Sequence, residues 1–275
     1  MTVNRFGRGL RGALVFLLFA LPAAGGTLRI ADAVPGGDTA VRQLALSEAL
    51  ADPALELSIR SSSVGEALRL LASGEVDLVL LERSGVPEEF RGRRMVYAVE
   101  ALVFYLNSSN PVEGFSQEGV RKLFRAARPV WSEYTLQKET DIQRFAVKPP
   151  RPDGLRFRSF FFGDGSRPVG IFELGSAPEL VLIVSANPEA VGAALYHPEA
   201  PVAVKAAAVD GVAPTLRTVT AGSYPLSFFR EALTAEEPPE PVRNFLEKLR
   251  SSAFYELLYD VGSLPVGDRP DRKKP

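Results

Sequence analysis

In the first third of the chain, apolar runs typical of strands alternate with segments whose apolar residues recur at helical spacing. Apolar runs at 27–33, 55–60 and 76–81 are typical of strands, and the last is nearly continuous, as expected for a strand buried on both faces. Between them, residues 41–49 and 64–71 repeat apolar positions at helical spacing. The order strand, helix, strand, helix, strand predicts a parallel sheet covered by helices.

The rest of the chain continues as an α/β protein. The apolar run at 96–106 is too long for one ordinary strand. The later predicted elements are a helix at 116–124 capped by Ser116, a strand at 142–147, a helix at 155–162, a buried strand at 180–184, a helix that begins at Asn187 with Pro188 in its first position, and a late helix at 241–250.

The N-terminus has the three-part layout of a secretory signal peptide. Arg5, Arg8 and Arg11 precede an apolar run at 13–20, and small residues follow up to Gly26. The run is shorter than the roughly 18 residues that a membrane-spanning helix needs, so a permanent anchor is the weaker alternative. We therefore expect cleavage near residues 24–26 and an exported protein.

Composition narrows the possible chemistry. The chain has no cysteine, which excludes disulfides, thiolate metal sites and a lipid-modified N-terminus, so a periplasmic protein that is not a lipoprotein is expected. Since His197 is the single histidine, a histidine metal cluster is impossible, and a Ser-His-Asp arrangement would depend on that one residue. We expect no enzyme, no metal and no cofactor.

Charge argues against a nucleic-acid partner. The formal net charge is −1, and it becomes more negative when the three leader arginines are removed. Basic residues are scattered except in the tail at 267–275, which is expected to be a solvated, disordered end.

Several short motifs in a fixed order carry a resemblance to a known family. They are an Asn-Pro turn at 107–116, a Trp-x-Glu pattern at 129–133, an Asp-Gly-Val-x-Pro-Thr ending at 202–215, a Gly-Ser-Tyr-Pro element at 222–226, and Leu-Pro-Val at 264–266. Each motif alone is a weak signal, but their order and spacing over most of residues 27–266 resemble the phosphate-type solute-binding proteins of ABC transporters.

The resemblance implies a fold and a function. The fold is α/β, a two-lobed type II periplasmic-binding-protein fold in which each lobe is a mostly parallel sheet flanked by helices. Lobe 1 would comprise residues 26–104 and 197–266, and lobe 2 residues 105–196, after a signal peptide at 1–25. The protein would be a monomer that captures a small oxyanion, phosphate or a relative, and passes it to the membrane permease of an ABC transporter.

In this family the anion is held by loops at strand ends and helix N-termini. In the first loop, Thr39 remains as a hydroxyl donor, whereas Asp32 and Asp38 would repel an anion if they point inward. The alternative is a simple turn and helix cap. Ser62 and Ser63 correspond to the second loop, although Ser63 followed by Glu66 is also explained as a capping box.

The segment after the buried strand at 76–81 matches another part of the family's site. By that match, Glu82 is expected to accept a hydrogen bond from a protonated oxyanion, with Arg83 beside it. A surface Glu-Arg pair is the equal alternative.

The third loop departs furthest from the family pattern. Arg151, Gly154 and Arg156 are candidate anion-binding residues, but Asp153 and Leu155 replace a serine and a threonine. Asp153 is expected to cap the helix and to consume amides that would otherwise bind the anion.

Another departure follows the Tyr-Pro-Leu element. The family often has an arginine shortly after it, where this chain has Phe228 and Phe229. An envelope interaction or sensory module that kept the lobes and lost small-anion binding is therefore the alternative function.

Overall fold

The computed structural model describes residues 26–135, 139–163, 165, 169–198 and 201–266. The signal peptide predicted at 1–25 and the basic tail predicted at 267–275 lie outside these residues. None of the helices within the described ranges combines the length and apolarity of a membrane span.

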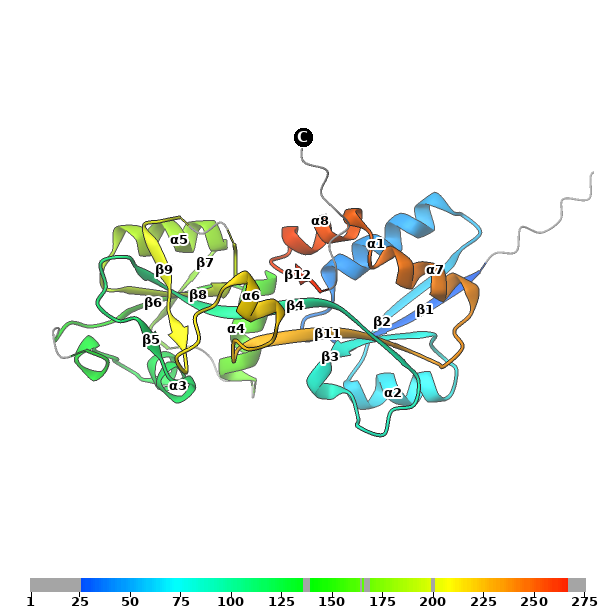
Figure 1. The fold of residues 1–275 in the computed structure, drawn as a ribbon, viewed down its shortest axis with the longest axis horizontal. Helices are drawn as coiled ribbons and strands as arrows, with labels where there is room; N and C mark the ends of the chain where they lie inside the picture. Colours follow the sequence, from blue (N-terminus) through cyan, green and yellow to red (C-terminus); the bar gives the residue numbers. More distant parts are fainter. Residues whose placement is uncertain (1–25, 136–138, 164, 166–168, 199–200, 267–275) are drawn as a thin grey trace, which may run out of the picture.

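Two α/β lobes lie side by side and are joined by two long strands (Figure 1). The first lobe contains β1 (Thr27–Asp32), α1 (Thr39–Ala51), β2 (Glu56–Ser61), α2 (Val64–Ala72), β3 (Leu78–Glu82), the 3-10 turn η1 (Arg83–Gly85), α7 (Glu240–Lys248), α8 (Ser252–Asp260) and β12 (Leu264–Pro265). The two-lobed type II fold predicted from the sequence is confirmed.

The second lobe is built around its own short parallel sheet. It contains β5 (Gly114–Phe115), α3 (Gln117–Arg125), the 3-10 turn η2 (Trp131–Glu133), β6 (Gln143–Val147), α4 (Pro152–Phe162), β7 (Ile171–Leu174), α5 (Ala177–Ala186), β8 (Ala190–Leu195), β9 (Val204–Ala206), β10 (Ala208–Val209) and α6 (Leu216–Thr220).

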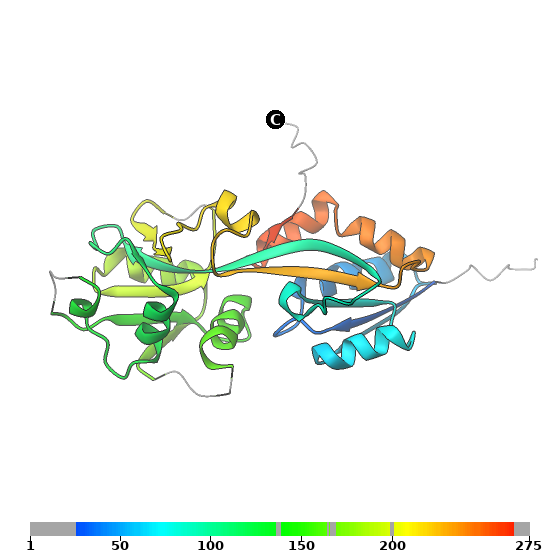
Figure 2. The ribbon, with the colours of Figure 1, turned by 60° about the horizontal axis from the view of Figure 1, so that its bottom comes forward.

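One continuous strand order, β2-β1-β3-β11-β4-β8-β6-β7, runs through both lobes. The outer strands pair in parallel in each lobe, whereas β11 (Ser227–Thr234) and β4 (Arg93–Asn107) pair antiparallel with each other and with their neighbours. At about 3.4 Å per residue, β4 is roughly 50 Å long, which is enough to reach through both lobes. Figure 2 shows β4 and β11 side by side between the lobes, as expected of a hinge.

The lobe boundaries at 104/105 and 196/197 stay a prediction, but the strand pairing differs from them in one region. β9 pairs with the C-terminal end of β4, and β10 pairs with β5. Residues 204–209, and α6 with them, therefore lie with the second lobe, whereas the prediction assigned residues 197–266 to the first.

Two predicted elements between residues 180 and 189 are wrong. The apolar run at 180–184 belongs to helix α5, because Ser176 caps it by accepting from the Glu179 N–H and because Leu180 and Val184, four residues apart, share its buried face. Asn187 does not begin a helix. Its carbonyl accepts the Ala190 N–H in a turn that leads directly into β8.

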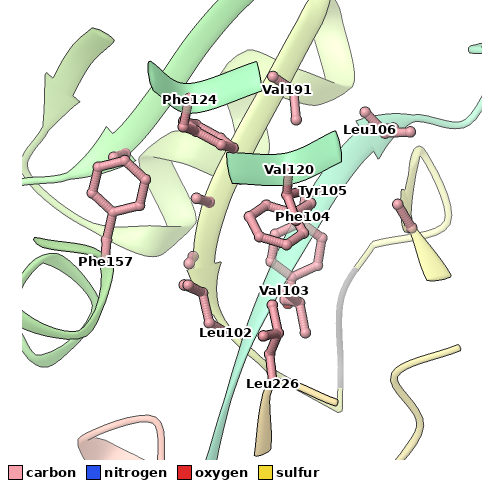
Figure 3. Close-up of a cluster of buried hydrophobic side chains, with 14 of the residues drawn as sticks. Leu102, Val103, Phe104, Tyr105, Leu106, Val120, Phe124, Phe157, Val191 and Leu226 are labelled. Atoms are coloured by element: carbon pink, nitrogen blue, oxygen red, sulfur yellow. The ribbon is translucent and has the colours of Figure 1, made fainter. Parts of the chain in front are cut away.

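The largest apolar core fills the second lobe. Phe104 from β4 packs with Phe124 from α3 and Phe161 from α4, and Phe157 joins the same aromatic group (Figure 3). Trp131 of the Trp-x-Glu motif is fully buried in this core. The motif that resembles the family is therefore part of the scaffold.

Candidate functional site

The first loop places two buried carboxylates at the N-terminus of α1. Asp38 is the N-cap and accepts the Val41 N–H at 2.9 Å. Asp32 accepts the N–H groups of Asp38 at 2.8 Å and Val34 at 3.2 Å. The backbone amides that an anion would need here are thus held by carboxylates of the chain itself.

The second loop remains a helix cap. Ser63 Oγ accepts the Glu66 N–H at 3.3 Å, which is the alternative left open above. The Oγ of Ser62 is buried and has no hydrogen-bond partner within the described part of the chain. Neither serine lines the small cavity between the lobes that Thr39, Arg156 and other residues surround.

Glu82 and Arg83 point to different partners. Glu82, at the end of β3, lies in ion-pair contact with Arg156 of the second lobe at 2.5 Å, without hydrogen-bond geometry. Arg83 pairs with Glu231 at 2.7 Å and lies over the ring of Phe229 at 4.4 Å. The structure therefore brings Glu82 to the lobe interface and keeps Arg83 away from it.

The third loop differs from its prediction at Asp153. The N-cap of α4 is Arg151, and Pro152 occupies the first helical position, so Asp153 lies inside the first turn and is not the cap. Its carboxylate accepts the Leu195 N–H at 2.8 Å, and burial raises its pKa. A side chain at Gly154 would place its Cβ 2.4 Å from the Val147 carbonyl oxygen, which explains the glycine.

Arg156 and Arg230 form the centre of a buried ion network. Arg156 donates from Nη2 to Oε2 of Glu100 at 2.9 Å, while Arg230 donates to Oε1 of the same carboxylate. Arg230 also donates to Asp38 at 2.9 Å, and the Ser263 hydroxyl donates to Glu100 at 3.0 Å. Five charged side chains are linked in this way: Asp38, Arg230, Glu100, Arg156 and Glu82.

The network joins the two lobes. Arg156 comes from α4 in the second lobe, Asp38 and Glu82 come from the first, and Glu100 and Arg230 lie on the connecting strands β4 and β11. Arg156 is 5% exposed, so its ion pairs are largely withdrawn from water. Its guanidinium also lies 4.2 Å from the ring centroid of Phe228.

Sequence reasoning did not identify Glu100 and Arg230. Glu100 was hidden in the long apolar run of β4, where an isolated acidic residue was the available signal. Arg230 lies four residues after Leu226, directly after Phe228 and Phe229, in the region where the resemblance implies an arginine.

The electrostatics of the network favour its charged state. Burial would raise the pKa of Glu100, but Arg230 and Arg156 outweigh burial and hold it below its usual range. Burial would lower the pKa of Arg230, but Glu100 and Asp38 raise it. Three carboxylates face two guanidinium groups, so the linked cluster carries a formal charge of −1.

A small cavity remains where the two lobes meet. Its volume is about 10 Å³, which is about the room that one water molecule needs. Thr39, Glu100, Arg156 and Arg230 are among the residues that line it. A Cβ at Gly36 would lie 2.4 Å from Cδ1 of Leu155, so Leu155 closes the cleft against the first loop.

Of the predicted site residues, Thr39 and Arg156 line this cavity and Glu82 contacts Arg156. The others do not line it; they are Ser62, Ser63, Arg83, Arg151 and Gly154.

The depressed pKa of Glu100 predicts a pH-dependent contribution to stability. Its stabilising effect is present above the unfolded pKa of about 4.3 and is lost as the pH falls through the lower folded value. In urea unfolding from pH 7 to pH 3, wild type should therefore exceed Glu100→Gln at neutral pH, and the difference should shrink on acidification. A difference that grows as the pH falls would contradict this assignment.

The geometry, two α/β lobes hinged by β4 and β11 around a charged interface, is that of the two-lobed type II periplasmic-binding-protein fold. The chain is 25% identical over 247 residues to the phosphate-binding protein PstS of Bacillus subtilis, covering 84% of this chain and 80% of that one. No family model matches the sequence.

Solved structures agree on the fold. A possible phosphate binding protein from Planctomyces limnophilus superposes with a TM-score of 0.75 at 20% identity, covering 89% of this chain and 94% of that one. An ABC-type phosphate transport receptor from Vibrio cholerae gives a TM-score of 0.61 at 18% identity, covering 87% and 100%. The chain is thus similar in fold and sequence to PstS-type solute-binding proteins, and these relatives are named as binding proteins or receptors and not as enzymes.

Proposed function

We propose that the protein is an exported, periplasmic solute-binding protein that captures a small phosphate-like oxyanion between its lobes for the membrane permease of an ABC transporter. One observation carries the proposal. The carboxylate of Glu100 is itself an oxyanion, and it is held between the guanidinium groups of Arg156 and Arg230 with a third donor from Ser263. The same donors suit a phosphate group.

Entry of an anion requires the lobes to separate. The cavity of about 10 Å³ is too small for phosphate, and Leu155 closes it against the first loop. Hinge motion along β4 and β11 would expose Arg156 and Arg230 and let the anion replace the carboxylates that now contact them.

Glu82 favours a protonated anion. Once Arg156 has turned to the solute, the Glu82 carboxylate can accept a hydrogen bond from a P–OH group, while it would repel an anion that has no proton to donate. Thr39, which lines the same cavity, is a further hydroxyl donor. These groups support phosphate or arsenate as the solute in preference to sulfate.

Thermal unfolding of the mature protein in the presence of phosphate, arsenate, sulfate or molybdate tests the proposal. Phosphate and arsenate should raise the midpoint as their concentration increases, because a ligand that binds the native state stabilises it. Arg156→Ala should abolish the shift. Arg158 lies on the same helix and pairs with Glu173 at the surface, so Arg158→Ala should retain the shift.

The ion network also favours a second function. Because the chain's own side chains occupy the cleft and their formal charge is already −1, an envelope interaction or sensory module without a small ligand would have the same interface. The absence of a shift with all four anions would support this second function and contradict the first.

A further inference from the structure

Glu100 is the point on which three separate segments of the molecule converge. It is 1% exposed, and its two carboxylate oxygens accept from α4 through Arg156, from β11 through Arg230 and from the segment before β12 through Ser263. It also lines the small cavity between the lobes. Its carboxylate therefore lies where an anion held by both arginines would lie.

Glu231 shows what a carboxylate with a purely structural role looks like in this fold. It is also 1% exposed and is also bound by two arginines, Arg83 and Arg94. Those arginines, however, are 48% and 40% exposed at their side chains, and all three residues lie on neighbouring segments of the first lobe and the connecting strands. Glu231 does not line the cavity between the lobes.

We infer that Glu100 is an internal anion that closes the lobes in place of a solute, and that it thereby sets the affinity of the cleft for oxyanions. The inference rests on the proposed function. A solute must displace this carboxylate from Arg156 and Arg230, so binding is a competition between two oxyanions for the same donors. A protein held closed by Glu100 exposes its donors in a small fraction of molecules, and the apparent affinity falls by that fraction.

The charge of the cluster also indicates that Glu100 lowers the affinity of the cleft for an oxyanion. With Glu100 in place, three carboxylates face two guanidinium groups, and a phosphate monoanion would add a further negative charge. Without the Glu100 carboxylate the remaining pairs are neutral, and a bound monoanion restores the formal charge of −1 that the native cluster carries. Removing Glu100 should therefore create a vacancy that an external oxyanion fills.

The test is rescue of Glu100→Ala by added oxyanions. This variant leaves two buried guanidinium groups short of a partner and makes room at the cavity. Phosphate should bind it about tenfold or more tightly than it binds wild type, and should raise its unfolding midpoint more than that of wild type. Glu100→Gln keeps the shape of the side chain and removes its charge, so its phosphate affinity should lie between those of wild type and Glu100→Ala. Glu231→Ala is the matched control and should gain no affinity.

The outcomes separate the inference from the proposed function. Binding of phosphate by wild type that becomes tighter in Glu100→Ala supports both the inference and the proposed function. Binding by wild type that is unchanged or weaker in both Glu100 variants overturns the inference and leaves the proposed function intact. If neither wild type nor folded Glu100→Gln binds any of phosphate, arsenate, sulfate or acetate, both are overturned. Should Glu100→Ala fail to fold, Glu100→Gln carries the same comparison.

Discussion

Replacing Arg230 with methionine is expected to lower the free energy of unfolding by about 3–5 kcal/mol, the usual cost of removing one partner from a buried ion pair. Arg230 is 4% exposed and holds both Asp38 and Glu100. Methionine preserves the apolar stem but leaves those two carboxylates short of their shared cation. Asp38 retains the Tyr97 hydroxyl at 2.6 Å, and Glu100 retains Arg156, so the protein should still fold.

Urea unfolding followed by circular dichroism measures this loss, and Arg94→Met is the control. Arg94 also pairs with a buried carboxylate, Glu231, but its side chain is 40% exposed and Arg83 remains as a second partner. That substitution should cost about 1 kcal/mol or less. Equal losses in the two variants would contradict a central role for Arg230.

Replacing Arg156 with alanine is expected to open the lobes as well as to destabilise the chain by about 3 kcal/mol or more. Arg156 is the member of the network that comes from the second lobe, and it contacts Glu82 and Glu100. Without it, Glu82 and Glu100 face the cleft with one cation, Arg230, and repel each other. Water should then enter between the lobes.

Small-angle X-ray scattering detects the opening as an increased radius of gyration, and the unfolding free energy reports the stability. Arg158→Ala, on the same helix, should leave the radius of gyration unchanged because its ion pair with Glu173 lies within the second lobe. An unchanged radius of gyration in Arg156→Ala would show that apolar contacts such as Leu155 against the first loop are sufficient to keep the lobes closed.

Local signals explain which elements could be predicted from the sequence. Ser63 and Ser116 cap α2 and α3 as expected, because a capping serine and the helical repeat after it are close in sequence. The run at 180–184 could not be assigned in the same way. Five apolar residues fit a buried strand and a buried helix equally well, and the cap that decides for the helix, Ser176, lies outside the run.

The site was harder to predict than the fold because its residues are distant in sequence. Glu100 and Arg230 are separated by 130 positions, and each occupies an ordinary place in a strand. Motif matching led to Ser62, Ser63 and Arg83, which the fold directs elsewhere, while Arg156 was found because it follows a recognisable loop. Of the carboxylates that contact Arg156, Glu82 lies in a motif that matches the family, whereas Glu100 lies within an apolar strand to which no motif points.

Titration calorimetry of phosphate into the mature wild-type protein tests the central claim most directly. Oxyanion capture between Arg156 and Arg230 predicts a saturable heat with one site per chain, which is lost in Arg156→Ala and kept in Arg158→Ala. A wild-type titration without saturable heat for phosphate or arsenate, or one that Arg156→Ala leaves unchanged, would contradict it.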